Sequence, residues 1–372
     1  MRVAFIGQKG VPATYGGVER HVEELSARVA AYGHQVCVYN RPHYNSRPPA
    51  RHRGVEVVTL PSLASKHLDT ISHVTICTGH ALRHHADIVH YHAIGPALLS
   101  WVPRTLGVCA LVTVHGRDWQ RPKWGSAATT ALRAGEWTAM HAPDETIVVS
   151  RSLTHELMSR YRRPAHYIPN GITLEPGDDP RILTGLGLEA GGYVLFASRL
   201  VPEKGAHYLL EAWRRLGSDM TLVMAGDSSF SADYAASLRA SCPHNVVFPG
   251  YVYGPRLATL FRNAALFVLP SDVEGLPLVV LEALGYGTPV LTSDIAPNRE
   301  VLGGVGRTFV AGSVDDLVRQ LSAALAALPA LRAQARQAAD QIAQTYDWDV
   351  VADETVALYG QALAARRART RR

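Results

Sequence analysis

The sequence predicts an α/β protein with two doubly wound parallel sheets, one in each half of the chain. Short β-rich runs alternate with helical patterns through the first 170 residues, as in parallel sheets covered on both faces. The turn-rich stretch 168–180 interrupts the alternation, which then restarts. The 372 residues also exceed the roughly 250–300 at which one core stops growing. We expect two Rossmann-like domains facing each other across a cleft, because such sheets bind ligands at the carboxyl ends of their strands.

The first half opens with a strand, a helix and a second strand. Valine and leucine recur at helical spacing from Val18 to Val29, which predicts a helix over 16–33. Gly33 suits the end of that helix. The predicted strands of this half are 2–7, 35–39, 54–60, 87–92, 110–116 and 145–150.

The second half repeats the same architecture without repeating the sequence. Its predicted strands are 193–198, 220–226, 245–250, 265–271 and 289–294. A helix over 206–217 follows the first of them. The last segment is predicted as a helix, because Val351, Leu358 and Ala362 fall along one face.

The composition is typical of a soluble globular protein, with 47% hydrophobic and 19% charged residues. No run of 18 apolar residues predicts a membrane-spanning helix, and the opening apolar stretch is too short for a secretory signal. The four cysteines lie far apart without a CxxC pair, which favours reduced thiols over a disulfide framework. We therefore expect a cytoplasmic protein.

The net charge is +5 and the isoelectric point about 9.0, a balance that suits nucleic acid, anionic lipid or phosphorylated substrates. Part of this charge lies in the tail RRARTRR, residues 366–372. A solvated, frayed end is the simplest interpretation of the tail, and attraction to the inner face of a membrane is the alternative. Only the charge suggests nucleic acid, which we do not expect as a partner.

The first loop, GQKGVPATYGG, is rich in glycine but does not spell GxGxxG, and no GK[ST] follows it. A nicotinamide site and an ATPase are therefore not expected. Gly16 and Gly17 open the first helix, whose free N–H groups favour an anion. The alternative is that both glycines only turn the chain.

Two cations follow the predicted strand 193–198. Arg199 and Lys204 offer a planar fork and a compact charge, both suited to phosphate oxygens. A pair of solvated surface cations is the plainer interpretation of this spacing alone. Their position at a strand end favours the phosphate interpretation.

The stretch SDVEGLPLVVLEALGYGTPV carries the strongest signal. Glu274 stands in a loop after a strand, Gly275 and Leu276 follow, and Pro277 suits a first helical position. The backbone amides there predict an anion site at a helix start. Glu282 lies on the same predicted helix. Two carboxylates near a basic loop suit the hydroxyls of a sugar ring and a ribose.

We do not expect a metal site. Several histidines lie close together in the sequence: His80, His84, His85, His90 and His92. No HExxH and no Cys/His pair accompanies them. No metal-binding DxD motif is placed convincingly, so Asp227 and Asp272 are interpreted as structural or hydrogen-bonding residues.

The segment HGRDWQRPKWG mixes cations with tryptophan and suits RNA, an acceptor glycan or a lipid diphosphate. We favour an acceptor because the segment lies in the first domain. The residues that we assign to an acceptor are Tyr15, Asp118, Trp119 and Arg121.

Several of these motifs occur together in one known family. The pieces are GGVERHVEEL, HG at 115–116, IPNGI at 168–172, SRLVPEKG at 198–205, AGD at 225–227, EGLPLVVLEALGYGTPV at 274–290 and the closing YDWDVVADETVALY. Together they resemble the retaining, nucleotide-sugar-dependent glycosyltransferases of family 4, which have the GT-B fold. The resemblance runs in register over nearly the whole chain.

The resemblance implies an acceptor-side Rossmann-like domain over 1–172 and a nucleotide-sugar-binding domain over 173–345. A helix over 346–372 would cross back onto the first domain and end in the basic tail.

The resemblance also implies roles for single residues. Arg199 and Lys204 would hold the donor diphosphate, and Glu274 would contact hydroxyls of the transferred sugar. Glu282 would bind the ribose, and His115 would lie near the reacting centre. These implied catalytic roles fall on His115, Glu274, Arg199 and Lys204.

The remaining implied donor contacts are made largely by backbone. Gly17 would face the diphosphate, and GYVY at 250–253 would hold the base. The donor-binding set is completed by Gly16, Tyr251, Val252, Gly275, Leu276 and Pro277.

The function implied is transfer of a hexose-type sugar from a UDP-, dTDP- or GDP-sugar to a glycan or polyprenyl-linked acceptor. The family reacts by front-side attack, without an essential metal or other cofactor. The opening IGQKGVPATYGG points to a bacterial subset that builds surface polysaccharides. Two alternatives stay open: a nucleotide-sugar epimerase on the same fold, and a non-catalytic nucleotide-sugar binder.

Overall fold

The computed structural model describes residues 1–14, 16–45, 47–63, 65, 68–121, 124–227 and 232–370. The chain divides into two compact units. Unit 1 comprises Met1–Gly171 with Trp348–Arg372, and unit 2 comprises Ile172–Asp347. These limits lie within two residues of the predicted boundaries.

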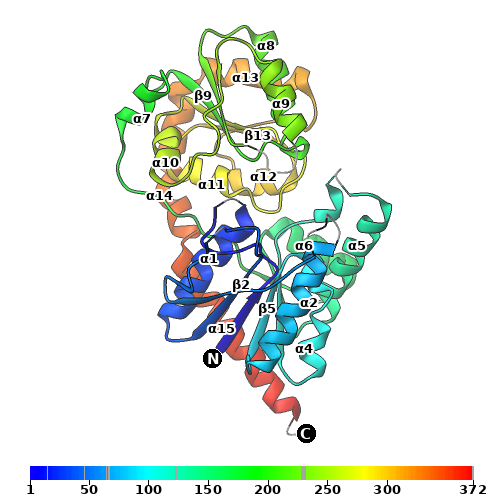
Figure 1. The fold of residues 1–372 in the computed structure, drawn as a ribbon. Coiled ribbons are helices and arrows are strands. Elements are labelled where there is room, and N and C mark those ends of the chain that lie inside the picture. Colours follow the sequence, from blue (N-terminus) through cyan, green and yellow to red (C-terminus); the bar gives the residue numbers. More distant parts are fainter. Residues whose placement is uncertain are drawn as a thin grey trace. The chain divides into compact units, whose positions relative to one another are not determined.

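Unit 1 is built around an eight-stranded sheet in the order β3-β4-β2-β1-β5-β6-β7-β8 (Figure 1). All neighbours run parallel except β3 and β4. The strands are β1 (Arg2–Ile6), β2 (Gln35–Asn40), β3 (Arg51–His52), β4 (Val55–Thr59), β5 (Ile88–His92), β6 (Cys109–Val114), β7 (Glu145–Val148) and β8 (His166–Tyr167).

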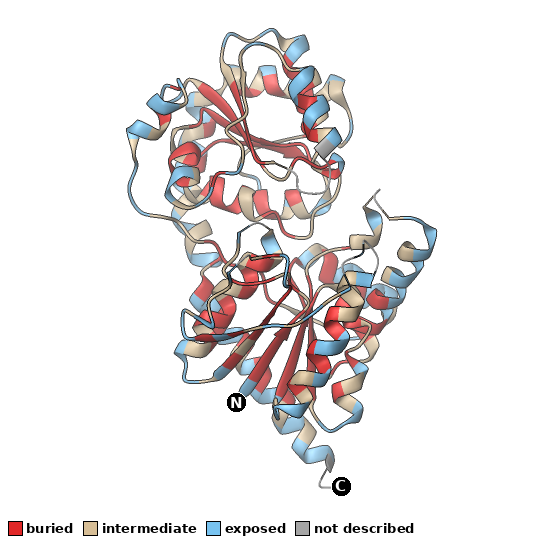
Figure 2. Ribbon diagram, in the orientation of Figure 1, coloured by how far each residue is buried: buried red, intermediate tan, exposed pale blue. Residues whose placement is uncertain are grey.

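Helices cover both faces of this sheet. They are α1 (Gly17–Ala31), α2 (Leu68–Arg83), α3 (Ile94–Ala97), α4 (Trp101–Thr105), α5 (Ser126–His141), α6 (Arg151–Tyr161) and α15 (Trp348–Thr370), with a 3-10 turn, η1, at Asp118–Gln120. Alternate strand residues point to opposite faces. Val3 and Phe5 of β1 pack in a core with α1 and α15. Ala4 and Ile6 pack in a second core with α2 and α3. Figure 2 shows the resulting buried layer along the strands.

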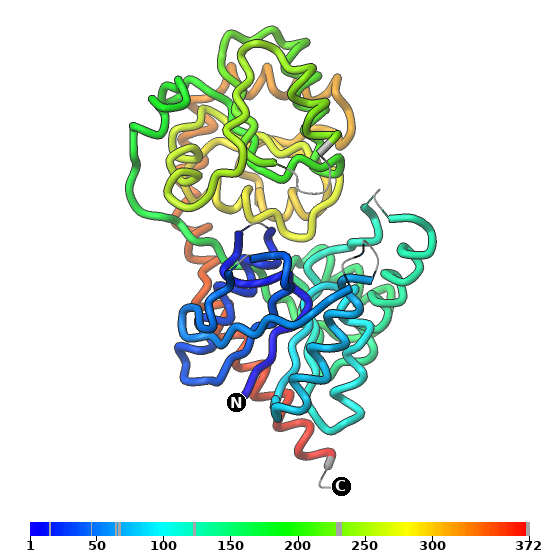
Figure 3. The backbone as a smooth tube through the Cα atoms, in the orientation of Figure 1, coloured from blue at the N-terminus to red at the C-terminus, as the bar shows by residue number. Residues whose placement is uncertain are grey.

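The C-terminal helix α15 packs beside α1, so the two ends of the chain share one core (Figure 3). Trp348 begins α15 and is 2% exposed. Its ring lies so close to Gly171 that a Cβ there would come within 2.5 Å. Near the other end, Arg366 donates to Gly107 O at 3.1 Å and pairs with the buried Asp144. The first residue of the basic tail is therefore anchored rather than frayed.

Unit 2 contains a six-stranded parallel sheet in the order β11-β10-β9-β12-β13-β14. Its strands are β9 (Tyr193–Ala197), β10 (Thr221–Ala225), β11 (Val246–Val247), β12 (Leu266–Leu269), β13 (Val290–Ser293) and β14 (Arg307–Phe309). Its helices are α7 (Pro180–Gly185), α8 (Ala206–Leu216), α9 (Ala232–Ala240), α10 (Gly254–Asn263), α11 (Leu278–Gly285), α12 (Ala296–Leu302), α13 (Val314–Ala326) and α14 (Leu328–Thr345), with a 3-10 turn, η2, at Pro202–Lys204.

The predicted fold class is confirmed, with strands at every predicted place. The prediction for 245–250 was too long, because only Val246 and Val247 pair. The sequence patterns missed β3, β8 and β14, which have two or three residues each. Within the described residues, no helix is both long and apolar enough to cross a membrane.

Replacing Trp348 tests how far the returning helix stabilises unit 1. Trp348→Ala should lower the free energy of unfolding of this unit by about 3–5 kcal/mol, the usual cost of truncating a large buried aromatic. Val350→Ala, at a side chain that is 47% exposed on the same helix, should change it by less than about 0.5 kcal/mol. Urea unfolding followed by circular dichroism measures both, and equal effects would contradict this role of Trp348.

Candidate active site

In unit 2, the loops that follow β9 and β12 lie side by side. The two strands pair in parallel, so the loops that follow them leave the sheet at the same edge. The Asp272 N–H donates to Glu203 O at 3.0 Å and joins the loops directly. Gly205 has φ +70°, and a Cβ there would lie 2.0 Å from Pro270 O. Only glycine allows the backbone at position 205 to come so close to Pro270 O. This close contact brings the residues just before Gly205 against the loop that follows β12.

This approach places Lys204 against Glu274. Lys204 Nζ lies 2.5 Å from Glu274 Oε1, and the Ser271 hydroxyl donates to the same oxygen at 2.7 Å. The two charged side chains are 15% and 8% exposed. Two residues that the sequence separates by 70 positions therefore form one partly buried ion pair. Ser271 was not singled out by sequence, since a serine next to an acid is unremarkable.

Arg199 belongs to the same edge of the sheet. It lies on the loop directly after β9, five residues before Lys204. The Leu200 N–H donates to Asp227 O at 3.1 Å, which ties this loop to the one after β10. The Ser198 N–H also donates to Ala225 O, at the end of β10, at 3.0 Å. The backbone on both sides of Arg199 is therefore fixed, and both predicted cations belong to one anchored segment.

Glu282 lies on α11, which begins just after Glu274. Its side chain is buried, and its charge contributes to raising the pKa of Tyr286, an effect due first to burial. Pro277 is the N-cap of α11 rather than its first residue. Proline has no N–H, so it adds no donor to the predicted anion site. The predicted donors that remain are the amides of Gly275 and Leu276, since the Val280 N–H already donates to Pro277 O at 3.0 Å.

The segment predicted to hold a base follows β11. The Gly226 N–H donates to Gly250 O at 2.8 Å and joins this segment to the loop after β10. Val252 is buried, whereas Tyr251 and Tyr253 are exposed. Their rings stack, with centroids 5.8 Å apart and planes at 18°. Tyr253 belongs to the predicted segment GYVY but was not singled out, although the alternation of tyrosines could have indicated it.

In unit 1, Gly16 and Gly17 begin α1 as predicted. Gly16 is the N-cap, with φ +104°, and a Cβ there would lie 2.0 Å from the Glu19 carboxylate. That carboxylate also accepts the Lys9 N–H at 3.1 Å. The helix start expected to face a diphosphate therefore already holds one acidic group, and the donor contact of Gly17 stays a prediction.

His115 follows β6 and joins two other histidines of unit 1. Its Nε2 lies 3.1 Å from Nδ1 of His92, the last residue of β5. The ring of His21, on α1, meets the His115 ring edge-on with centroids 4.6 Å apart. Burial lowers the pKa of His21 to about 4 and holds the pKa values of His92 and His115 well below the usual range. All three are therefore neutral at neutral pH. The sequence analysis missed His21, because the helical pattern around it does not reveal that it contacts residues far along the chain.

The residues predicted to contact an acceptor are engaged with their neighbours. The Trp119 indole N–H donates to the buried Glu136 at 2.7 Å, and the Arg133 guanidinium lies over the Trp119 ring at 4.7 Å. Asp118 and Arg121 form an ion pair with each other at 2.9 Å. These contacts order the segment, and its role with an acceptor stays a prediction. Tyr15 lies outside the described residues.

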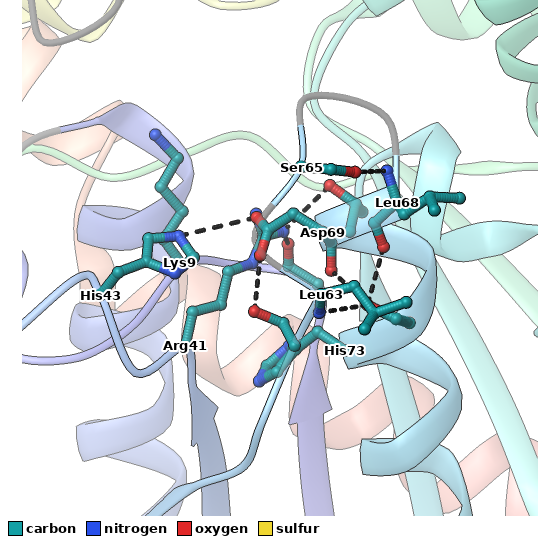
Figure 4. A network of polar contacts seen from close by, with 12 residues as sticks. Lys9, Arg41, His43, Leu63, Ser65, Leu68, Asp69 and His73 are labelled. Atoms are coloured by element: carbon teal, nitrogen blue, oxygen red, sulfur yellow. Dashed lines mark hydrogen bonds and ion pairs between the residues drawn. The ribbon is translucent and has the colours of Figure 1, made fainter.

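A polar network ties the loops after β1 and β2 to the start of α2 (Figure 4). Arg41 follows β2 and pairs with Asp69 at 2.5 Å, and His43 lies 3.6 Å from the same carboxylate. Burial would raise the pKa of Asp69, but the Ser62 hydrogen bond and the Arg41 charge more than offset it and lower the pKa. The Arg41 N–H also donates to Lys9 O at 2.8 Å. This network fixes the first loop at the carboxyl edge of the sheet.

Comparison with known proteins identifies the chain. Residues 15–176 match a model described as Glycosyltransferase Family 4, and residues 187–342 match one described as Glycosyl transferases group 1. The α-maltose-1-phosphate synthase of Mycolicibacterium smegmatis is 25% identical over 396 residues, covering 96% of this chain and 99% of the relative.

Solved structures share the fold. Sucrose-phosphate synthase from Thermosynechococcus elongatus superposes with a TM-score of 0.84 at 20% identity, covering 98% of this chain and 99% of that one. Anabaena HepE in complex with UDP-glucose superposes with a TM-score of 0.80 at 19% identity, covering 98% of this chain and 100% of that one. The fold and these matches define the protein as a glycosyltransferase of the GT-B fold. Within that class, the chain belongs to the group 1 and family 4 glycosyltransferases, whose two models together match most of it.

The buried histidines predict that acid destabilises unit 1. His21 and His73 have folded-state pKa values lowered to about 4 by burial, against 6.5 when unfolded. Below pH 6.5 these histidines bind protons in the unfolded chain but stay neutral in the folded unit. The contribution to the unfolding free energy of unit 1 that is present above pH 6.5 is therefore lost progressively as the pH falls towards 4. At about pH 5 each histidine should lower the unfolding free energy by on the order of 2 kcal/mol relative to neutral pH.

Urea unfolding at about pH 7.5 and pH 5 measures this loss. His73→Gln, which removes one of the groups, should show a weaker pH dependence than the wild-type chain. An unfolding free energy of unit 1 that stays constant or rises on acidification would contradict the prediction.

Proposed function

We propose that this protein is a retaining glycosyltransferase that moves a hexose-type sugar from a nucleotide-diphospho-sugar to a glycan or polyprenyl-linked acceptor. The observation that carries the proposal is the contact of Lys204 with Glu274 at the carboxyl edge of the unit 2 sheet. A cation for a diphosphate and an acid for sugar hydroxyls belong next to each other, because the sugar is bonded directly to the diphosphate in the donor.

Arg199, Lys204 and the amides before α11 would stabilise the leaving diphosphate. Negative charge builds on that group as its bond to the anomeric carbon breaks, and preorganised donors lower the barrier most where charge develops. This arrangement supplies positive charge without an essential metal ion.

Glu274 is better suited to binding the sugar than to attacking it. One of its oxygens already accepts from Lys204 and from Ser271. Hydrogen bonds and a cation at a carboxylate stabilise its charge and reduce its strength as a nucleophile. We therefore favour front-side attack, in which the leaving oxygen takes the proton of the acceptor hydroxyl.

His115 would act as a neutral imidazole near the reacting sugar. Burial holds its pKa well below the usual range. A neutral ring can exchange hydrogen bonds with a sugar hydroxyl but adds no positive charge to the diphosphate. This assignment leaves the charged contacts of the diphosphate to unit 2, while Gly17 of unit 1 would face the diphosphate through its backbone.

The rest of the donor would lie along the same edge of unit 2. Glu282 would hold the ribose hydroxyls, and the backbone near Tyr251 and Val252 would hold the base. HepE was solved with UDP-glucose, and a starch synthase of Arabidopsis thaliana with ADP. These relatives support a nucleotide-sugar donor, which we expect to be a UDP-, dTDP- or GDP-sugar.

We further propose that the enzyme works in bacterial surface-polysaccharide biosynthesis, in the cytoplasm and at the inner face of the membrane where its acceptor is lipid-linked. The first loop and the basic C-terminal tail support this assignment.

Lys204→Ala should reduce sugar transfer by about 10²–10³-fold, the usual cost of removing one preorganised charge-stabilising group. Arg181→Ala provides the matched control, because this cation of unit 2 is 90% exposed and forms its ion pair with Asp179. A radiolabelled-sugar transfer assay measures both. Unchanged turnover in Lys204→Ala would rule out the diphosphate assignment.

Glu282→Gln should weaken nucleotide binding by about 10-fold or more, because charged hydrogen bonds are roughly twice as strong as neutral ones. Glu211→Gln, on the exposed face of α8, is the control. Isothermal titration calorimetry with the preferred nucleotide compares them. Equal affinities of Glu282→Gln and wild type would contradict the ribose role.

A further inference from the structure

Three histidines of unit 1 gather their ring nitrogens in a small buried space. His21 comes from α1, His92 from the end of β5 and His115 from the residue after β6. One nitrogen of each lies within 4.8 Å of one nitrogen of both others. His21 and His92 are 2% and 0% exposed, and His115 is partly exposed.

The protonation of His21 is set by a neighbouring amide. His21 Nδ1 lies 2.7 Å from Asn170 Oδ1. An amide oxygen only accepts, so the proton is on Nδ1 and Nε2 keeps a free lone pair. This pattern, in which the far nitrogen of an imidazole donates to a fixed oxygen, is typical of histidines that bind metal ions.

Nε2 of His21 is fully buried and lacks a hydrogen-bond partner among the described residues. Nε2 of His92 is also unpaired there, but His92 meets His115 through its other nitrogen, Nδ1. Leaving such a group unpaired costs about 1–3 kcal/mol, and native structures rarely accept this without a reason. The neighbouring His90 differs, because its nitrogens reach the Tyr359 and Thr113 hydroxyls at 2.7 Å each.

The spacing of the nitrogens is close to that of a coordination sphere. Zinc–nitrogen bonds of about 2.0–2.1 Å in tetrahedral geometry separate two ligand atoms by about 3.3 Å. His92 Nδ1 and His115 Nε2 are already 3.1 Å apart, joined by a hydrogen bond that a bound metal ion would replace. Bringing in a third nitrogen from at most 4.8 Å needs a movement of about 1.5 Å or less, which side-chain rotation can supply.

We propose that His21, His92 and His115 form a binding site for a divalent transition-metal ion such as Zn²⁺, with the fourth coordination position open. Neutral imidazoles are ligands that zinc, copper and nickel prefer over magnesium or calcium. Each neutral imidazole offers one nitrogen lone pair, which is the form that binds a metal ion. This site departs from the sequence analysis, which expected no metal.

The metal would oppose sugar transfer rather than support it. A metal ion takes the His115 lone pair that a sugar hydroxyl would otherwise meet, so Zn²⁺ should inhibit the enzyme. This consequence rests on the proposed function, whereas metal binding itself does not.

Calorimetric titration of the chelator-treated full-length protein with ZnCl₂ tests the site directly. We expect one saturable Zn²⁺ site and no binding of Mg²⁺. His21→Ala should weaken zinc binding more than about 100-fold, and Asn170→Ala, which removes only the orienting amide, about 10–100-fold. His84→Ala is the matched control, since this histidine stacks on His80 at the surface, with ring centroids 4.1 Å apart. It should leave the buried site unchanged.

Circular dichroism checks that each variant folds, and Asn170→Ala keeps the test valid should His21→Ala not fold. The absence of a saturable Zn²⁺ site, or equal affinity in wild type and both site variants, would overturn the proposal and leave a hydrogen-bonded imidazole cluster. A transfer assay with and without Zn²⁺ then tests inhibition separately. Zinc binding without any transferase activity would count against the proposed function alone.

Discussion

The close packing of two loops in unit 2 is the constraint on which the donor site depends. Gly205 lies against Pro270 O with no room for a Cβ, and the Asp272 N–H bonds to Glu203 O. This packing brings the side chain of Lys204 into contact with that of Glu274. A partly buried ion pair gains little net stability, because both charges lose hydration. The pair is better explained as a preformed site, in which a charged ligand replaces contacts that the protein already makes.

The two units offer chemically different groups. Unit 2 presents fixed charges at its sheet edge, from Lys204 and Glu274, and helix amides beside them. Unit 1 presents neutral imidazoles, whose low pKa values follow from burial. A reaction that expels a diphosphate needs charge at the leaving group and uncharged hydrogen-bonding groups at the sugar. The proposed division of roles matches this difference.

The sequence predicted most of the fold because long strands and amphipathic helices carry their periodicity locally. Two-residue strands such as β3 and β8 have no periodicity to detect, and their lengths depend on neighbours in the sheet. Lys204 and Glu274 could be selected from their motifs, but their contact could not, because it depends on the fit of Gly205. His21 escaped notice because its partners, His92 and Asn170, lie 71 and 149 positions further along the chain.

Lys204 is proposed to bind the diphosphate of the donor. Comparing the affinity of a nucleoside diphosphate with that of its monophosphate tests this most directly, because the two ligands differ only in the group that Lys204 should hold. Calorimetry on wild type should give a clear preference for the diphosphate, and Lys204→Ala should reduce that preference by about 10-fold or more. An unchanged preference in the variant would contradict the account.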